Sequence, residues 1–105
     1  MINRKKFTKK INKYVDGIKD HEINMFRDFI QVNEISEEYL SKKQKGMKDH
    51  VLSIMSENKE LSEKYYVFHL SKTIDTKWKP IDLDKIVNHF YKSSETIKKI
   101  YEEVR

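Results

Sequence analysis

Along the first third of the chain, apolar residues recur at steps of three and four. They fall at the following positions, with His21 in the one gap: Phe7, Ile11, Tyr14, Ile18, Met25, Phe29 and Val32. This spacing places them on one face of a helix. We expect a single long helix over residues 5–32, with Gly17 near its middle. Because the spacing is close to a heptad, the same face is a candidate seam for a homodimer.

Two further helices are predicted in the middle of the chain. The first covers residues 37–56, after corner and capping chemistry at Asn33 and Ser36. Its inward positions are Leu40, Met47, Val51, Ile54 and Met55. The next helix follows a cap at Asn58 and has Leu61, Tyr65 and Phe68 on one side. Tyr66, Val67 and Leu70 widen that apolar surface, so we expect this helix to be the most central.

The clearest break in the pattern lies at residues 75–80. Pro80 disfavours helical backbone at Lys79. Trp78 is expected to fold back onto the core, and Asp82 is well placed to cap the next helix.

Composition agrees with a helical protein. Two glycines and one proline supply little of the turn chemistry that a β-sheet protein needs. Charged residues make up 37% of the 105 residues, equal to the hydrophobic share, so the core must be small. We therefore predict an all-α fold, a compact bundle of four to five helices, with residues 1–105 forming one domain.

The absence of cysteine excludes disulfides and thiolate metal sites and favours a cytoplasmic location. No apolar run approaches the roughly 20 residues that cross a bilayer. The four histidines, His21, His50, His69 and His89, never pair at helical ligand spacing, so neither a metal nor another cofactor is expected. Catalysis is not expected either, because the chain offers no nucleophile elbow and no phosphate-cradling loop.

Positive charge is concentrated at the start of the chain. Residues 1–19 hold seven basic residues against Asp16 alone, a net charge of +6, whereas the whole chain carries +5. Six of these residues are candidate phosphate contacts: Arg4, Lys5, Lys6, Lys9, Lys10 and Lys13. Such a basic arm attracts phosphate backbones or anionic surfaces. The alternative is a solvated, lysine-rich helix start that only keeps the protein soluble.

The last quarter of the chain, residues 82–105, is a candidate helix-turn-helix. Ile86, Val87 and Phe90 form the inner face of a first helix, and Tyr91 and Lys92 make the corner. A second helix begins at Ser93, and Thr96, Ile97 and Ile100 follow at the spacing of such motifs. This phase points five candidate DNA-contacting residues outward: Ser93, Ser94, Glu95, Lys98 and Lys99.

Two features of this segment depart from the usual motif. Tyr91 and Lys92 stand at the corner where glycine and an apolar residue are common, and a positive φ would be costly at Tyr91. Val87 replaces the usual small residue. The alternative is one continuous helix over residues 83–104.

Residues 61–105 resemble a sigma-factor region-4-like module, as in phage late-gene regulators of the ArpU and RinA type. The resemblance rests on the run Leu61 to Leu70, the Trp78-Lys79 loop and the candidate motif, in that order. It implies binding of double-stranded DNA through the helix that begins at Ser93, and transcription regulation in a phage or other mobile element.

The leading functional hypothesis is therefore a small DNA-binding regulator that acts as a homodimer through its first helix. The second is a protein-binding helical bundle whose basic arm meets an acidic protein partner. Bacteriocin immunity proteins, phage inhibitors of host enzymes and anti-CRISPR proteins are of this kind. A third and weaker hypothesis is peripheral membrane attachment by the amphipathic first helix.

Overall fold

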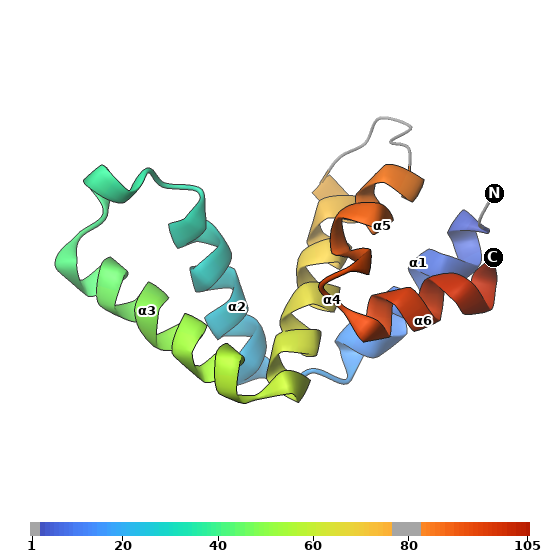
Figure 1. The fold of residues 1–105 in the computed structure, drawn as a ribbon, viewed down its shortest axis with the longest axis horizontal. Coiled ribbons are helices and arrows are strands. Elements are labelled where there is room, and N and C mark those ends of the chain that lie inside the picture. Colours follow the sequence, from blue (N-terminus) through green and yellow to red (C-terminus); the bar gives the residue numbers. More distant parts are fainter. Residues whose placement is uncertain (1–2, 77–82) are drawn as a thin grey trace. The chain divides into compact units, whose positions relative to one another are not determined.

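A computed structural model describes residues 3–76 and 83–105, and every regular element in these ranges is helical. The elements are α1 (Arg4–Asp16), α2 (Asp20–Asn33), the short 3₁₀ helix η1 (Glu37–Tyr39), α3 (Lys42–Glu57), α4 (Lys59–Thr76), α5 (Leu83–Tyr91) and α6 (Glu95–Val104) (Figure 1). The predicted all-α fold is confirmed. The proposed roles of Trp78, Pro80 and Asp82 concern positions outside the described residues.

The prediction of one long first helix is wrong, because the chain breaks between Asp16 and Asp20. Gly17 keeps a helical φ of −84°, so the break does not depend on its lack of a side chain. Lys19 is extended, with φ −69° and ψ 147°, and its backbone N–H donates to the carboxylate of Glu22 at 3.3 Å. Acidic residues in the first turn then favour a new helix start. This raises the number of α-helices in the described ranges to six.

The break changes which side chains face inward. The second part of the predicted long helix, α2, buries Phe26, Phe29 and Val32, whereas His21 is exposed. In α1, Phe7 and Ile11 are completely buried within the protein's own core. Five of the seven residues of the predicted dimer seam are therefore buried within the chain: Phe7, Ile11, Ile18, Phe29 and Val32.

The second predicted helix begins later than expected, at Lys42 in place of residue 37. Ser41 explains this start, because its hydroxyl accepts from the Gln44 N–H at 3.1 Å and its own N–H donates to the Gln44 side chain at 2.9 Å. This reciprocal capping box fixes the N-terminal end of α3. The predicted cap at Asn58 is confirmed: its Oδ1 accepts from the Leu61 N–H at 3.1 Å.

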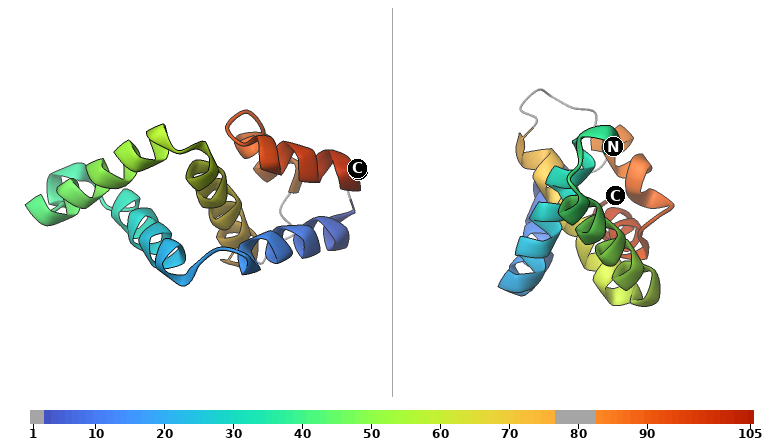
Figure 2. Two further views of the ribbon diagram at one scale, coloured as in Figure 1. Left: turned by 90° about the horizontal axis from the view of Figure 1, so that it is seen from below. Right: turned by 90° about the vertical axis from the view of Figure 1, so that its left-hand side faces the viewer.

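The chain groups into two compact units. Unit 1 comprises Met1–Ile18 and Glu63–Arg105, and unit 2 comprises Lys19–Ser62. In unit 2, α2 and α3 pack side by side as a helical hairpin (Figures 1 and 2). Lys48 of α3 pairs at 3.4 Å with Glu37 of η1, which lies in the connection between α2 and α3.

Unit 1 packs α1, α4, α5 and α6 around one hydrophobic core. Its buried members are Phe7, Ile11, Val67, Leu70, Val87, Phe90, Ile97 and Val104. Helix α6 packs against both α1 and α5. The two segments singled out in the sequence, the basic start and the last quarter, are therefore neighbours in the same unit (Figure 2).

The sharp corner predicted near Tyr91 is confirmed, and the single continuous helix is excluded. The N–H groups of Ser93 and Ser94 both donate to the Phe90 carbonyl, at 3.0 and 2.9 Å. Ser94 is extended, with φ −133° and ψ 114°. No described residue has a positive φ, so the corner forms without the backbone conformation that favours glycine. Val87, which stands where such motifs usually have a small residue, is completely buried in α5.

Candidate nucleic-acid interface

Helix α1 separates an apolar face from a basic one. Phe7 and Ile11 point into the core of unit 1, with Tyr14 and Val15 packed at its edge. The six basic residues predicted to contact phosphate are all exposed on the remaining surface of this helix: Arg4, Lys5, Lys6, Lys9, Lys10 and Lys13. Burial of the apolar face therefore fixes the direction in which the positive charge is presented.

The ends of α1 are held by specific contacts. Asn3 caps the helix, because its Oδ1 accepts from the Lys6 N–H at 3.1 Å. The Asn3 N–H also donates to the Val104 carbonyl at the end of α6, at 3.3 Å. Lys10 pairs with Glu103 of α6 at 3.1 Å. In the described part of the chain, the other five basic side chains make no ion pair.

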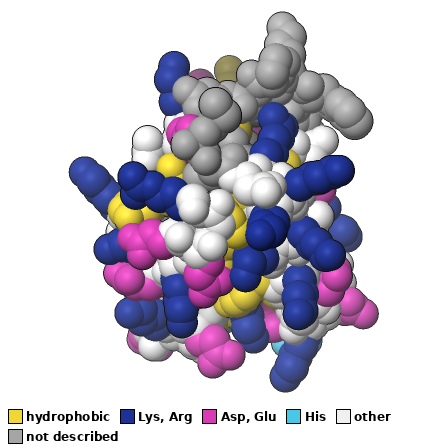
Figure 3. Space-filling model, turned by 90° about the vertical axis from the view of Figure 1, so that its right-hand side faces the viewer, with side chains coloured by type: hydrophobic (Ala, Val, Ile, Leu, Met, Phe, Trp, Pro, Cys, Tyr) yellow, Lys and Arg dark blue, Asp and Glu magenta, His cyan; other side chains and the backbone are white. Residues whose placement is uncertain are grey.

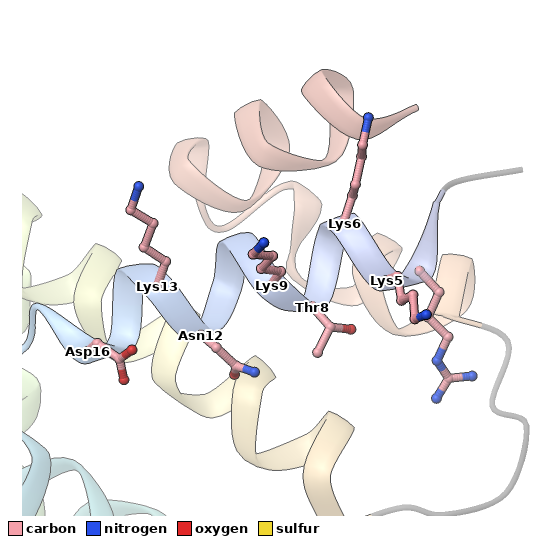
Figure 4. Close-up of a pocket in the computed structure, with 8 residues that line it drawn as sticks. Lys5, Lys6, Thr8, Lys9, Asn12, Lys13 and Asp16 are labelled. Carbon is pink, nitrogen blue, oxygen red and sulfur yellow. The ribbon is translucent and has the colours of Figure 1, made fainter.

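An open cavity of about 1000 Å³ runs along this basic face (Figure 4). It is lined by Arg4, Lys5, Lys6, Thr8, Lys9, Asn12, Lys13 and Asp16. Figure 4 shows the Lys6 and Lys13 side chains on one side of the helix and those of Thr8 and Asn12 on the other. Among the described residues of this lining, one acidic group, Asp16, lies among five basic groups. The cavity is therefore suited to an anionic ligand.

The two units differ in charge. Unit 1 contains 15 lysines and arginines against 8 acidic residues, a net charge of +7, whereas unit 2 contains 7 against 9, a net charge of −2. Figure 3 shows a molecular face on which many Lys and Arg side chains are interspersed with acidic ones. The positive charge of the protein thus belongs to unit 1.

The predicted recognition helix presents its residues differently from the prediction. Ser93 lies in the turn before α6 and is exposed. Within α6, Glu95 and Lys99 are exposed and Lys98 is half-buried. Ser94 was predicted to point outward, and this was wrong: it is only 1% exposed. Its hydroxyl accepts from the Ile97 N–H at 3.1 Å, which makes it the N-cap of α6 in place of Ser93.

A carboxylate from α4 occupies the N-terminal end of α6. Glu63 accepts hydrogen bonds from the Ser94 hydroxyl at 2.5 Å, from the Glu95 N–H at 3.1 Å and from the Thr96 N–H at 3.2 Å. Burial raises the pKa of Glu63, but these bonds outweigh it and lower the pKa below its ordinary value. Sequence analysis missed this residue, because it lies 31 residues before Ser94, inside a different helix.

The outer side of α6 is held by contacts to its neighbours. The Lys98 ammonium lies 5.4 Å from the centre of the Tyr91 ring. Tyr91 donates a hydrogen bond to Glu102 at 2.9 Å, which raises the pKa of the Tyr91 phenol. Tyr101 donates to Asp84 of α5 at 2.9 Å. These contacts fix α6 against α5 through side chains that would otherwise be available to a ligand.

Within residues 3–76 and 83–105, no three or more His, Cys, Asp or Glu side chains are grouped closely enough to hold a metal ion. In the same ranges, none of the helices combines the length and the apolar character needed to span a membrane.

Comparison with known proteins adds no relative. Neither a protein family, nor a curated protein, nor a solved structure matches the chain. Function is therefore inferred from the geometry and the charge of unit 1.

Proposed function

We propose that the protein binds double-stranded DNA, and that the exposed face of α1 contacts the phosphate backbone. The observation that carries this proposal is the set of five basic side chains on that face without an ion-pair partner among the described residues: Arg4, Lys5, Lys6, Lys9 and Lys13. Their five positive charges are part of the net +7 of unit 1.

The dimensions of α1 fit a phosphate backbone. A helix of 13 residues is about 20 Å long, and positions four residues apart are about 6 Å apart along its axis. Each strand of B-DNA presents one phosphate per about 3.4 Å of helix axis. About six phosphates of each strand fall within this length of the DNA axis, and because the strand winds around the axis, a straight helix follows only part of them.

Aromatic burial favours double-stranded over single-stranded DNA. Proteins that bind single strands stack successive bases on exposed aromatic side chains. The aromatic residues of α1 and its neighbour α6 are unsuited to this, because Phe7 is completely buried and Tyr14 and Tyr101 are half-buried. The basic face thus offers charge without a stacking platform.

The test is a titration of fluorescent duplex DNA with the protein at several salt concentrations between about 50 and 200 mM. If all five free basic groups contact phosphates, the logarithm of the binding constant falls against the logarithm of salt with a slope of about −4.5. Lys9→Ala/Lys13→Ala should reduce this slope by about 1.8 and weaken binding by about tenfold or more. Absence of binding at low salt would refute the proposal.

A matched control comes from unit 2. Lys42→Ala/Lys45→Ala removes the same charge from two exposed positions of α3. If α1 is the contact surface, this control keeps the affinity and the salt slope of the unchanged protein. An equal loss in both double variants would show that only the net charge matters.

The narrower role of a transcription regulator in a phage or other mobile element rests on the resemblance over residues 61–105. Dimerisation also stays a prediction. Most of the residues first expected to form its seam are buried within the chain.

The second candidate, a protein-binding bundle, is favoured by a different observation. Tyr39 of η1 is 76% exposed, and Ile35 and Leu52 of the same unit are also exposed. Large apolar side chains in water are common at protein interfaces. Copurification from the native host tests this candidate: a protein recovered by the unchanged chain and lost with Tyr39→Ser would support it over DNA binding.

A further inference from the structure

In a helix-turn-helix protein, the second helix lies in the major groove, and the residues at its N-terminal end contact base edges. Helix α6 is the second helix of the candidate motif in this protein. The free backbone N–H groups at such an end also bind phosphate. In this protein those groups are already used. The N–H groups of Glu95 and Thr96 donate to Glu63, and the N–H of Ile97 donates to the Ser94 hydroxyl.

The charge at this end of α6 is negative. The Glu63 carboxylate lies directly at the helix N-terminus, and the exposed Glu95 carboxylate belongs to the first turn of the same helix. Two carboxylates oppose the positive end of the helix dipole and repel an approaching phosphate. The favoured docking geometry for a recognition helix is therefore electrostatically unfavourable here.

The rest of α6 supplies little basic character for reading bases. The Lys98 ammonium lies over the Tyr91 ring. The Lys10 ammonium near α6 belongs to α1 and is paired with Glu103. Lys99 and Arg105 are the exposed basic side chains of the described segment 95–105, against the exposed acids Glu95, Glu102 and Glu103.

The residue types on α1 are suited to phosphate contacts and not to base recognition. Five of its six basic residues are lysines, and Arg4 is the exception. Lysine acts as a flexible point charge, whereas the planar guanidinium of arginine forms the paired hydrogen bonds that most often identify guanine. A lysine-rich helix face therefore neutralises phosphates without distinguishing base pairs.

From these contacts we infer that binding is independent of DNA sequence: α1 contacts the phosphate backbone of any duplex, and α6 does not read base edges. This inference rests on the proposed function and narrows it to one class of ligand. In this role α6 is a structural helix that α1, α4 and α5 hold in place.

The first test selects bound molecules from a library of duplexes with a randomised central segment. Sequencing should show no enriched motif, and unrelated duplexes of equal length should bind within about threefold of one another. Sequence-specific proteins bind their sites roughly 10³- to 10⁷-fold more tightly than other DNA. An enriched motif whose duplex binds about 100-fold more tightly than others would overturn this inference while leaving the proposed function intact. Absence of binding to every duplex at low salt would instead refute both.

The second test compares two double variants that remove the same charge. Lys98→Ala/Lys99→Ala should weaken binding by about threefold at most, because one of these lysines is already held over Tyr91. Lys9→Ala/Lys13→Ala should weaken it by about tenfold or more. Circular dichroism first establishes that both variants keep their helical content. A larger loss from the α6 pair than from the α1 pair would overturn the inference.

Discussion

Glu63 connects α4 to the start of α6, and its removal should destabilise the protein measurably. Replacing it with alanine leaves the Ser94 hydroxyl and the N–H groups of Glu95 and Thr96 without their acceptor. A hydrogen bond to a charged group contributes about 1.5–3 kcal/mol, and the loss of a helix cap costs about 0.5–2 kcal/mol.

The expected loss from Glu63→Ala is near the upper end of the cap range. Water can replace the carboxylate at the exposed Glu95 N–H, so the three bonds do not add in full. We expect a loss of about 2 kcal/mol, which lowers the melting temperature by roughly 8–16 °C in a protein of this size. Thermal unfolding followed by circular dichroism measures this shift. Glu38→Gln, a charge change at an exposed position of η1, is the control and should leave the melting temperature unchanged.

The pH dependence gives the effect of Glu63 a second signature. Its pKa is lowered in the folded protein from an ordinary value of 4.5, so the folded state binds its proton less readily than the unfolded state does. The stabilisation is therefore present above about pH 4.5 and is lost as the pH falls through the folded pKa. The gap in melting temperature between the unchanged protein and Glu63→Gln should shrink over that range. Equal melting temperatures at neutral pH, or a gap that does not change in acid, would refute this account of the cap.

Three further substitutions test other contacts. Glu103→Gln releases Lys10 to contact phosphate, so it should steepen the salt slope of DNA binding by about 0.9 and raise the affinity, as measured by the same titration. Tyr101→Phe removes the hydrogen bond to Asp84 and should cost about 1 kcal/mol in urea unfolding; an unchanged midpoint would show that the bond is dispensable. Ser41→Ala breaks the capping box of α3 and should cost about 1 kcal/mol, seen as faster hydrogen exchange in the first turn of that helix; unchanged exchange would contradict the cap.

Hydrophobic periodicity predicted most of the helices and failed at two places, the break between Asp16 and Asp20 and the start of α3 at Lys42. Phe7, Ile11, Ile97 and Val104 are buried as their spacing indicated. The stripe over residues 5–32 read as continuous because the apolar residues on both sides of Gly17 share nearly the same phase. Periodicity does not report the extended backbone at Lys19, which the Glu22 carboxylate stabilises.

The basic part of the interface could be predicted from local sequence, whereas the state of α6 could not. A lysine at a solvent-facing helix position is exposed almost wherever the helix packs, so the placement of Lys5, Lys9 and Lys13 followed from the phase of Phe7 and Ile11. The orientation of Ser94 depends on a partner in another helix. Its hydroxyl points inward because it both caps α6 and donates to Glu63.

The Glu63 contact also explains how one chain can have the outline of a helix-turn-helix without its chemistry. A short helix of 10 residues gains little stability on its own, so its exposed N–H groups need acceptors. In a DNA-binding protein, a phosphate group can accept from such N–H groups at the N-terminus of a helix. Here the Glu63 carboxylate of α4 is the acceptor, so the N–H groups at the start of α6 have hydrogen-bond partners within the protein itself. A helix that is already satisfied gains little from phosphate, and the positive charge available for binding is left to α1.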